Sequence, residues 1–361
     1  MDKLPDVTTT KPSSRSCGES AESDEELLVV ITGGSKGIGR SCVECFARRG
    51  ARVLFSFCSD AEAAAQVERA FEPAGRVQGR RLDQGDFDSV HAFAAEVELW
   101  RAGRQVDALV NNAGLGTATM SAYLSPRTKG RPGEQEEGRG SKGDATELEA
   151  ARRRAGEDVA LMRVNALGPM WVTEALLPMM QPRLTNQRKQ TVLFVGSVGG
   201  GSQSVFPGFR PADGMSKAAL VYACNHFAAR RRRLAAVPMI PGGSDGGASA
   251  GGPTHDTAGA PGATVAAASD ISGCVNFLCL CPGATLTDMF RASTLDKLDG
   301  AGQLENFLRT LPQGRLTLPQ EVGEAVYWLC TSPAASMFHG AVIDGSAGLA
   351  VRPGVFTEFA F

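Results

Sequence analysis

The sequence contains few of the residues that build metal sites or extracellular frameworks. Of 361 residues only 4 are histidine, and none of these lies in a metal-ligand spacing. The 9 cysteines form an odd set without regular spacing, which argues against a disulfide framework and fits a reducing compartment. Cys42 and Cys45, and likewise Cys279 and Cys281, are close pairs that we expect to be small buried hydrophobic residues. The sequence therefore predicts no metal site.

Long apolar runs and a strong charge excess are also missing. No run of about eighteen apolar residues occurs, so no membrane span is expected. The formal net charge of -2 gives no reason to expect nucleic acid or an anionic membrane as a partner. Residues 1–25 are polar and acidic, lack the apolar stretch of a secretory signal, and predict a disordered tail. These absences favour a cytoplasmic protein with one folded domain at residues 26–361.

Two internal stretches, residues 125–145 and 241–270, lack the apolar residues needed for a core. The first is rich in glycine and charge, and the second consists almost entirely of small residues, proline and threonine. Neither can bury enough apolar surface to offset the entropy of ordering. We interpret both as flexible inserts in loops of the single domain, with partner-binding segments as the alternative.

Short apolar strands alternate with helical patterns along the rest of the chain. Strands are expected at residues 27–32, 52–57, 77–82, 106–110, 191–195, 275–281 and 341–343. Helical periodicity occurs at residues 37–49, 61–71 and 86–100, in a long stretch through Asn165 towards Met180, and from Asp213. This alternation predicts an α/β fold, a doubly wound parallel sheet (Rossmann fold) of seven strands with helices on both faces.

A glycine-rich turn, TGGSKGIG at residues 32–39, joins the first strand to the first helix. Gly33 allows a tight turn, Gly37 lets the backbone approach a diphosphate, and Gly39 lets the helix pack close to the sheet. The free N–H groups and the dipole at the start of the helix attract phosphate. A glycine motif in this context predicts a dinucleotide site.

Further motifs occur in the order found in short-chain dehydrogenases/reductases. They are NNAG at residues 111–114, Asp83, Asn165 in RVNALG, Ser197, Lys217, PGATLT at residues 282–287, and the Asp-Gly pair at 344–345. From about residue 27 to 349, without the two inserts, the chain resembles that family, in particular its 3-oxoacyl-carrier-protein reductase and carbonyl reductase branch. The resemblance implies a cofactor site formed by Gly33, Ser35, Lys36, Gly37, Ile38, Gly39, Asp83, Asn111, Ala113, Gly114, Lys217, Pro282, Gly283, Thr285 and Thr287.

The end of the second strand bears on which nicotinamide nucleotide is bound. An acid at this position would bind the ribose 2′-hydroxyl and select NAD, but residues 55–59 contain none. Lys36, directly before Gly37, could meet a 2′-phosphate. Both features predict NADP (NADPH) as the cofactor, and Asp60 is then expected to cap the next helix.

At one catalytic position the chain differs from the family that it resembles. The family uses a serine to hold the substrate oxygen, a tyrosine to move the proton, a lysine to assist the tyrosine and hold the ribose, and an asparagine in a proton relay. Ser197, Lys217 and Asn165 match these roles, but Asp213 stands at the tyrosine position, and none of the 3 tyrosines lies four residues before a lysine.

A carboxylate is a poor replacement for the tyrosine. A free aspartate has a pKa of about 3.9 and a tyrosine of about 10, and a lysine one helical turn away favours the charged carboxylate. An anion at neutral pH has no proton to donate, so Asp213 predicts impaired carbonyl reduction.

The sequence thus predicts an NADP-dependent oxidoreductase acting on a small carbonyl or alcohol substrate, with impaired activity, and the resemblance implies a homodimer or homotetramer. The alternatives are a catalytically inactive nucleotide-binding or scaffold protein that retains the fold, and an enzyme with altered, aspartate-dependent chemistry. In a lid at residues 286–315 the side chains that suggest an apolar pocket are Met289, Phe290, Leu295 and Phe307.

Single residues also have structural alternatives. Asp83 is consistent with a turn or capping residue, and Asn165 with a structural polar group inside a helix. Ser197 is consistent with a residue that ends a strand, and Lys217 with a surface lysine.

Overall fold

The structure is a computed structural model, and the residues it describes are 26–116, 119–124, 142–180, 190–201, 210–230, 275–298 and 301–351. The tail expected at residues 1–25 and the insert expected at 241–270 lie outside the described residues, as do residues 125–141 of the other insert. Residues 142–145, which we expected within that insert, instead begin a long helix.

Seven strands form one parallel sheet, as the sequence predicts. They are β1 (Leu28–Ile31), β2 (Arg52–Phe57), β3 (Val77–Arg81), β4 (Ala108–Asn111), β5 (Thr191–Val195), β6 (Asn276–Pro282) and β7 (Val342–Gly345). Their order is β3-β2-β1-β4-β5-β6-β7, and every neighbouring pair is parallel. The chain therefore builds the sheet outward in both directions from β1 and β4, which leaves a crevice at their carboxyl ends.

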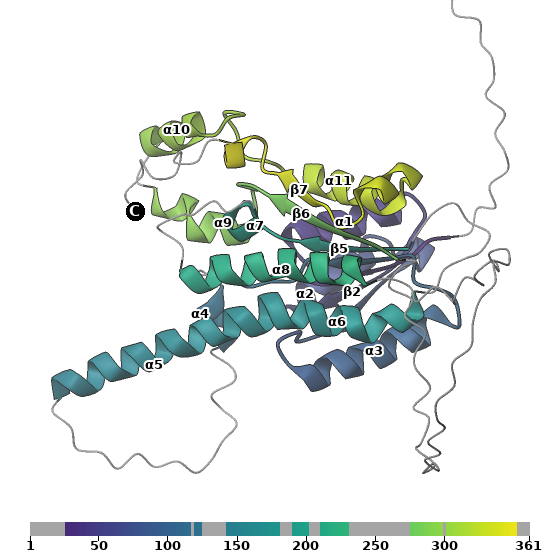
Figure 1. Cartoon of the computed structure of the whole chain (residues 1–361), viewed down its shortest axis with the longest axis horizontal. Helices are drawn as coiled ribbons and strands as arrows, with labels where there is room; N and C mark the ends of the chain where they lie inside the picture. Colours follow the sequence, from purple (N-terminus) through teal and green to yellow (C-terminus); the bar gives the residue numbers. More distant parts are fainter. Residues whose placement is uncertain are drawn as a thin grey trace, which may run out of the picture.

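Helices cover both faces of this sheet (Figure 1). They are α1 (Gly37–Arg48), α2 (Ala61–Arg69), α3 (Phe87–Arg101), α4 (Met120–Leu124), α5 (Lys142–Met162), α6 (Gly168–Leu176), α7 (Val198–Gly201), α8 (Pro211–Ala229), α9 (Asp288–Ser293), α10 (Ala301–Thr310) and α11 (Pro319–Thr331). Buried residues of α1, α2 and α11 share one core with the sheet, and those of α3, α6 and α8 share the other. The doubly wound arrangement is thus confirmed.

Aromatic side chains fill the core beneath α8. The Phe227 ring of α8 stacks between Phe194 of β5 and Phe277 of β6, with ring centroids 6.4 Å and 5.5 Å apart. All three are fully buried. Burying a phenylalanine side chain contributes about 1.5–3 kcal/mol, so this stack fixes α8 on the strands whose ends form the crevice.

The long helix expected through Asn165 is interrupted. A π-helical turn, Arg163–Leu167, separates α5 from α6, and α6 ends at Leu176 rather than near Met180. The extra residue in a π turn rotates the side chains that follow it, and such turns occur frequently at functional sites. Helical periodicity alone does not reveal a turn of this kind.

Six of the seven cysteines in the described part of the chain are buried, and Cys58 is partly exposed. The burial expected for Cys42, Cys45, Cys279 and Cys281 is confirmed. Cys279 and Cys281 point to the same side of β6, with their sulfurs 3.9 Å apart.

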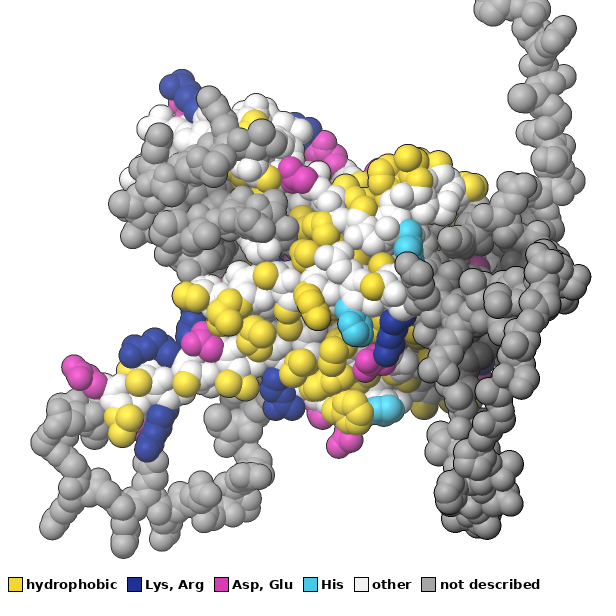
Figure 2. All heavy atoms as spheres, viewed as in Figure 1, with side chains coloured by type: hydrophobic (Ala, Val, Ile, Leu, Met, Phe, Trp, Pro, Cys, Tyr) yellow, Lys and Arg dark blue, Asp and Glu magenta, His cyan; other side chains and the backbone are white. Residues whose placement is uncertain are grey.

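Apolar side chains also gather on the outer face of α5, α6 and α8 (Figure 2). Val159 of α5, Leu167 of the π-helical turn and Tyr222 of α8 are exposed. None of the helices in the described ranges combines the length and apolar character needed to cross a bilayer.

Candidate functional site

A cavity of about 1280 Å³ opens at the carboxyl ends of the strands. Its walls come from the glycine-rich turn, the ends of β2 to β6, the start of α8 and the helix α9. Most predicted site residues line it, namely Gly33, Ser35, Lys36, Gly37, Ile38, Asp83, Ala113, Gly114, Ser197, Asp213, Lys217, Pro282, Gly283, Thr285 and Thr287. The fold therefore brings these residues, which are distant in sequence, into one place.

The glycine positions of the glycine-rich turn have little room for a side chain. Gly33 has φ 68°, and a Cβ there would lie 2.8 Å from Ala113 Cα. Gly37 has φ 55° and faces Thr287, whose Cγ2 would lie 3.3 Å from an added Cβ. Gly39 lies outside the cavity lining, and a Cβ added there would clash with the Gly33 carbonyl, so its part is the close packing of α1.

The N-terminus of α1 suits an anion. Lys36 occupies the N-cap position but its side chain makes no capping hydrogen bond, and the first turn contains no acidic residue. The first N–H groups of a helix have no intrahelical acceptor and carry the positive end of the dipole. Because Gly37 and Ile38 line the cavity, these donors lie where a phosphate could accept from them.

The two asparagines of NNAG have separate structural tasks. Asn111, outside the cavity lining, is buried and donates from Nδ2 to Thr173 Oγ1 at 2.9 Å, so it fastens β4 to α6. Asn112, which the sequence did not single out, donates from Nδ2 to the carbonyls of Thr32 and Gly33 at 3.0 Å and 3.2 Å. It thereby fixes the glycine-rich turn at the cavity wall.

Tyr123 of α4 reaches the residue expected beside the adenine. Its hydroxyl donates to Asp83 Oδ1 at 2.8 Å, and the same oxygen accepts from the Gly85 N–H at 3.0 Å. Both Tyr123 and Asp83 line the cavity. Burial raises the pKa of Tyr123 to about 12, so the hydroxyl keeps its proton at neutral pH. Local sequence patterns do not reveal this contact, because 40 positions separate the two residues.

Asn165 connects the π-helical turn to two other parts of the site. Its Oδ1 accepts from the Leu115 N–H at 2.7 Å, and its Nδ2 donates to the Leu115 carbonyl at 2.8 Å. Nδ2 also donates to Ser216 Oγ at 3.1 Å, and that hydroxyl donates to the Asp213 carbonyl at 2.7 Å. The fully buried Asn165 therefore holds the loop after β4 and the start of α8 together.

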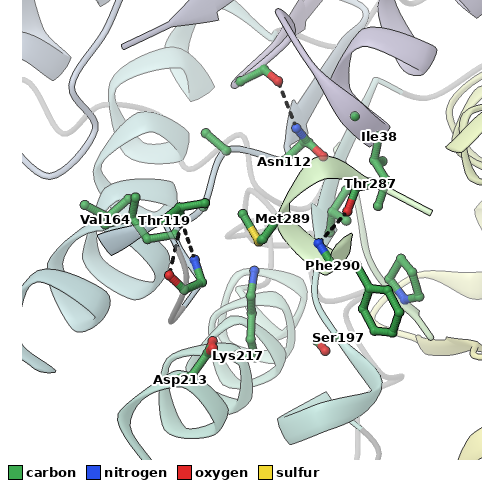
Figure 3. Close-up of a pocket in the computed structure, with 18 of the residues that line it drawn as sticks. Ile38, Asn112, Thr119, Val164, Ser197, Asp213, Lys217, Thr287, Met289 and Phe290 are labelled. Atoms are coloured by element: carbon green, nitrogen blue, oxygen red, sulfur yellow. Dashed lines mark hydrogen bonds between the residues drawn. The ribbon is translucent and has the colours of Figure 1, made fainter. Parts of the chain in front are cut away.

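Asp213 and Lys217 both line the cavity from α8, one helical turn apart, and the Lys217 side chain extends into it (Figure 3). Ser197 follows β5 on the same side, and its Oγ accepts from the Gly199 N–H at 3.2 Å. Burial lowers the pKa of the Lys217 amine, whereas the charge of Asp213 opposes this change. The cavity thus holds a hydroxyl, an amine and a carboxylate, and Asp213 lies at the α8 position where the sequence resemblance leads us to expect a tyrosine.

The other two tyrosines lie elsewhere. Tyr222 is exposed on α8. Tyr327 of α11 packs edge-on against Phe46, with the Arg49 guanidinium 4.5 Å above its ring. Neither lines the cavity, so neither takes the place of the missing phenol.

The lid contributes less to the cavity than its sequence suggests. Met289 of α9 lies in the cavity (Figure 3), close enough to Gly116 that an added Cβ there would be 2.9 Å from its sulfur. Phe290 also lines the cavity. Phe307 and Leu295 lie outside the cavity lining and pack in a small apolar cluster that also includes Val198, Ala284 and Leu349. Of the four side chains that suggested an apolar pocket, Met289 and Phe290 therefore line the cavity, and the other two support its wall.

Lys36 has a partner that the sequence did not indicate. Its Nζ lies 2.5 Å from Asp60 Oδ2. Asp60 Oδ1 accepts from the Ala63 N–H at 2.9 Å, which confirms the expected cap of α2. Among the described residues, no group of three or more His, Cys, Asp or Glu side chains is arranged to hold a metal ion.

Comparisons with known proteins give matches of two kinds. Residues 27–129 match the family model described as short chain dehydrogenase. The chain is 35% identical to the uncharacterized oxidoreductase YxbG of Bacillus subtilis over 91 residues, an alignment that covers 25% of this chain and 33% of that protein. It is 40% identical to retinol dehydrogenase 12 of Mus musculus over 91 residues, which are 24% of this chain and 28% of that protein. The chain thus aligns with about a third of the length of these curated relatives.

Solved structures resemble the whole fold. RhlG of Pseudomonas aeruginosa, in an active-site complex with NADP, has a TM-score of 0.61 and 21% identity, over 90% of this chain and 96% of that one. A variant of actinorhodin polyketide ketoreductase with NADPH has a TM-score of 0.60 and 19% identity, over 91% of this chain and 98% of that one. At such identities the likeness shows the fold.

A parallel sheet whose glycine-rich turn opens onto a cavity at its carboxyl edge defines a Rossmann-type fold. Residues 27–129 thus match the short-chain dehydrogenase family, and the described fold is like that of solved short-chain dehydrogenases/reductases.

Proposed function

We propose that this chain binds NADP(H) in the cavity and is an oxidoreductase for a small carbonyl or alcohol substrate, with turnover impaired by Asp213. The observation that carries the proposal is the convergence of the α1 N-terminus, Ser197 and Lys217 on one cavity. Bound NADPH would supply a hydride to a carbonyl carbon, and the same site run in reverse would accept one from an alcohol.

The residues present fit a nicotinamide dinucleotide. Gly33 and Gly37 leave the backbone bare where a diphosphate would approach, and the first turn of α1 keeps its N–H donors. Asp83 lines the part of the cavity that would receive the adenine, and Thr287 lies on the wall formed after β6. The NADP form is supported by Lys36 and by the uncharged end of β2, and two structural neighbours are described with NADP or NADPH.

The protein's own groups would divide the remaining work. The Ser197 hydroxyl would donate to the substrate oxygen, and the Lys217 amine would hold the ribose hydroxyls. Reduction also requires one proton at that oxygen, and a carboxylate at position 213 offers none at neutral pH. Its negative charge would also disfavour an alkoxide forming beside Ser197. Water is then the remaining proton source, which accounts for slow turnover.

The second candidate is a nucleotide-binding protein without catalysis. It is favoured by the same replacement of the family tyrosine by Asp213, because a fold is retained more easily than an activity. The two candidates differ in turnover and agree in binding. NADPH oxidation with 3-oxoacyl thioesters and diketones measures the first, and NADPH fluorescence measures the second.

A negative charge added at the expected phosphate site tests the binding of NADPH. Ser35 lines the cavity beside the start of α1, and Ser35→Glu would place a carboxylate there, whereas Ser35→Gln has a similar size and no charge. We expect the Glu variant to bind NADPH at least about tenfold more weakly than the Gln variant. Equal affinities in the two variants would contradict a phosphate at this position, and absence of NADPH binding by the natural chain would contradict the function.

The apolar outer face of α5, α6 and α8 supports assembly into a homodimer or homotetramer (Figure 2). Exposed apolar side chains on these helices, such as Val159 of α5 and Tyr222 of α8, would be covered by a second copy of the chain. Light scattering of the full chain measures its mass, and a Val159→Glu, Tyr222→Glu variant should dissociate it. A monomeric natural chain would refute the assembly.

A further inference from the structure

The lysine that faces the nucleotide site is held by an aspartate outside that site. Lys36 lines the cavity, whereas its partner Asp60 does not. Asp60 is fixed by its second oxygen, which accepts from the Ala63 N–H at the start of α2. The carboxylate therefore stays in place while the longer lysine side chain can turn from it towards the cavity.

This ion pair is suited to exchange. The exposed fractions of the Lys36 and Asp60 side chains are 55% and 38%, and ion pairs in such positions are weak. The Lys36 ammonium and the Ala63 N–H lower the pKa of the Asp60 carboxyl. Asp60 is consequently an anion at neutral pH and competes with any other anion for the same ammonium.

The surrounding wall offers a 2′-phosphate little else. Ser56, Phe57 and Cys58 line this end of the cavity and carry no charge, and the Ser56 hydroxyl already accepts from the Gly33 N–H at 3.1 Å. Lys36 therefore supplies the attraction for a phosphate on the adenosine ribose, and Asp60 opposes it.

We propose that Asp60 sets the selectivity of this chain between phosphorylated and unphosphorylated adenosine ribose, by competing with the 2′-phosphate for Lys36. The proposal rests on the nucleotide site described under the proposed function. A 2′-phosphate must share the Lys36 ammonium with Asp60 or displace Asp60 from it, and the neighbouring carboxylate also repels the phosphate dianion. A 2′-hydroxyl leaves the pair intact. The preference for NADPH over NADH is therefore present but small in the natural chain.

The test uses two probes that lack the nicotinamide, 2′,5′-ADP and 5′-ADP, titrated calorimetrically into the full chain. Asp60→Asn removes the charge but keeps a side chain that caps α2 well. We expect it to bind 2′,5′-ADP about 5–10-fold more tightly than the natural chain, with 5′-ADP unchanged, because a charge-assisted bond to phosphate becomes available. Lys36→Met should abolish the preference between the probes.

Asp86→Asn is the matched control, because Asp86 caps α3 in the same way, accepting from the Asp88 N–H, and lies outside the cavity lining. It should leave both affinities unchanged. If both probes bind and Asp60→Asn changes the affinity of neither, the competition is refuted while the nucleotide site stands. If neither probe binds any variant, the nucleotide site and the competition both fail. Equal tightening of both probes by Asp60→Asn would show a general charge effect and refute selectivity.

Discussion

Asn165 and Ser216 are 51 positions apart in the chain, yet the Asn165 amide donates to the Ser216 hydroxyl at 3.1 Å in the buried interior. This bond joins the π-helical turn to α8, the helix that carries Asp213 and Lys217. The same amide holds both backbone groups of Leu115. Asn165 is therefore the point at which three walls of the cavity are fastened to one another.

Removing the Asn165 side chain should destabilise the protein more than removing its partner, the Ser216 hydroxyl. Asn165→Ala leaves the Leu115 N–H and carbonyl without their buried partner, and we expect a loss of about 2–3 kcal/mol in the free energy of unfolding. Ser216→Ala removes only the link to α8 and should cost about 1 kcal/mol. Urea unfolding at unchanged m-value measures both. Equal costs for the two variants would show that Leu115 is held by other groups.

Restoring the phenol should restore turnover. Asp213→Tyr places a proton donor one helical turn before Lys217, and general acid catalysis contributes about 10²–10⁴-fold. We expect the natural chain near background and the Tyr variant at least about tenfold faster in NADPH oxidation. Asp213→Asn, which removes the charge without adding a donor of this kind, is the control. Robust turnover of the natural chain that is lost in Asp213→Asn would instead make Asp213 an acid–base residue.

The Tyr123 hydroxyl should contribute to adenine binding through Asp83. Tyr123→Phe removes the bond that orients the Asp83 carboxylate, and we expect NADPH affinity to fall about 3–10-fold. Reduced nicotinamide mononucleotide has no adenine, so its affinity should stay the same. Tyr222→Phe, at an exposed tyrosine, provides the matched control. A similar loss for both ligands would place the effect away from the adenine.

Acid should loosen the attachment of the lid. Glu321 accepts hydrogen bonds from the Arg315 side chain and from the Leu318 N–H. Between these two residues lies Thr317, whose backbone N–H and carbonyl are hydrogen-bonded to Ala284 and Leu286 at the start of the lid. The Arg315 guanidinium lowers the pKa of Glu321 from 4.5 to about 2. A depressed carboxyl pKa contributes stability that is present above about pH 4.5 and is lost as the pH falls towards 2.

The Tm of the natural chain should therefore fall more steeply between about pH 5 and pH 3 than that of Glu321→Gln. Glu305→Gln, at the exposed pair with Arg309 on α10, should keep the steeper profile of the natural chain. Identical profiles for all three proteins would assign the acid sensitivity to other carboxyl groups.

The order of strands and helices follows from the sequence because its causes are local. Alternating apolar runs and helical periods mark the elements, and the glycines at 33, 37 and 39 mark the points of the turn where a side chain has little room. The residues that gather at the cavity follow from the same rule, since parallel strands bring their carboxyl ends to one edge.

Contacts between distant segments could not be predicted in this way. Nothing in the local pattern links Tyr123 to Asp83 or Lys36 to Asp60, because each pair depends on how two elements are placed in space. Phe307 is one of the apolar side chains that suggested a pocket, but it packs in the small cluster beside the cavity. The π-helical turn at Asn165 likewise has no local signature that helical periodicity reveals.

Cys58 gives the protein a reporter of its own. Its thiol is partly exposed and lines the cavity at the end of β2, whereas burial raises the pKa of Cys224 to about 12 and that of Cys45 to about 11. An alkylating reagent reacts with the accessible thiolate, so among the described cysteines it should mark Cys58 first. A nucleotide that covers the end of β2 would slow this labelling, and peptide mass spectrometry could follow occupancy of the cavity without any catalytic turnover.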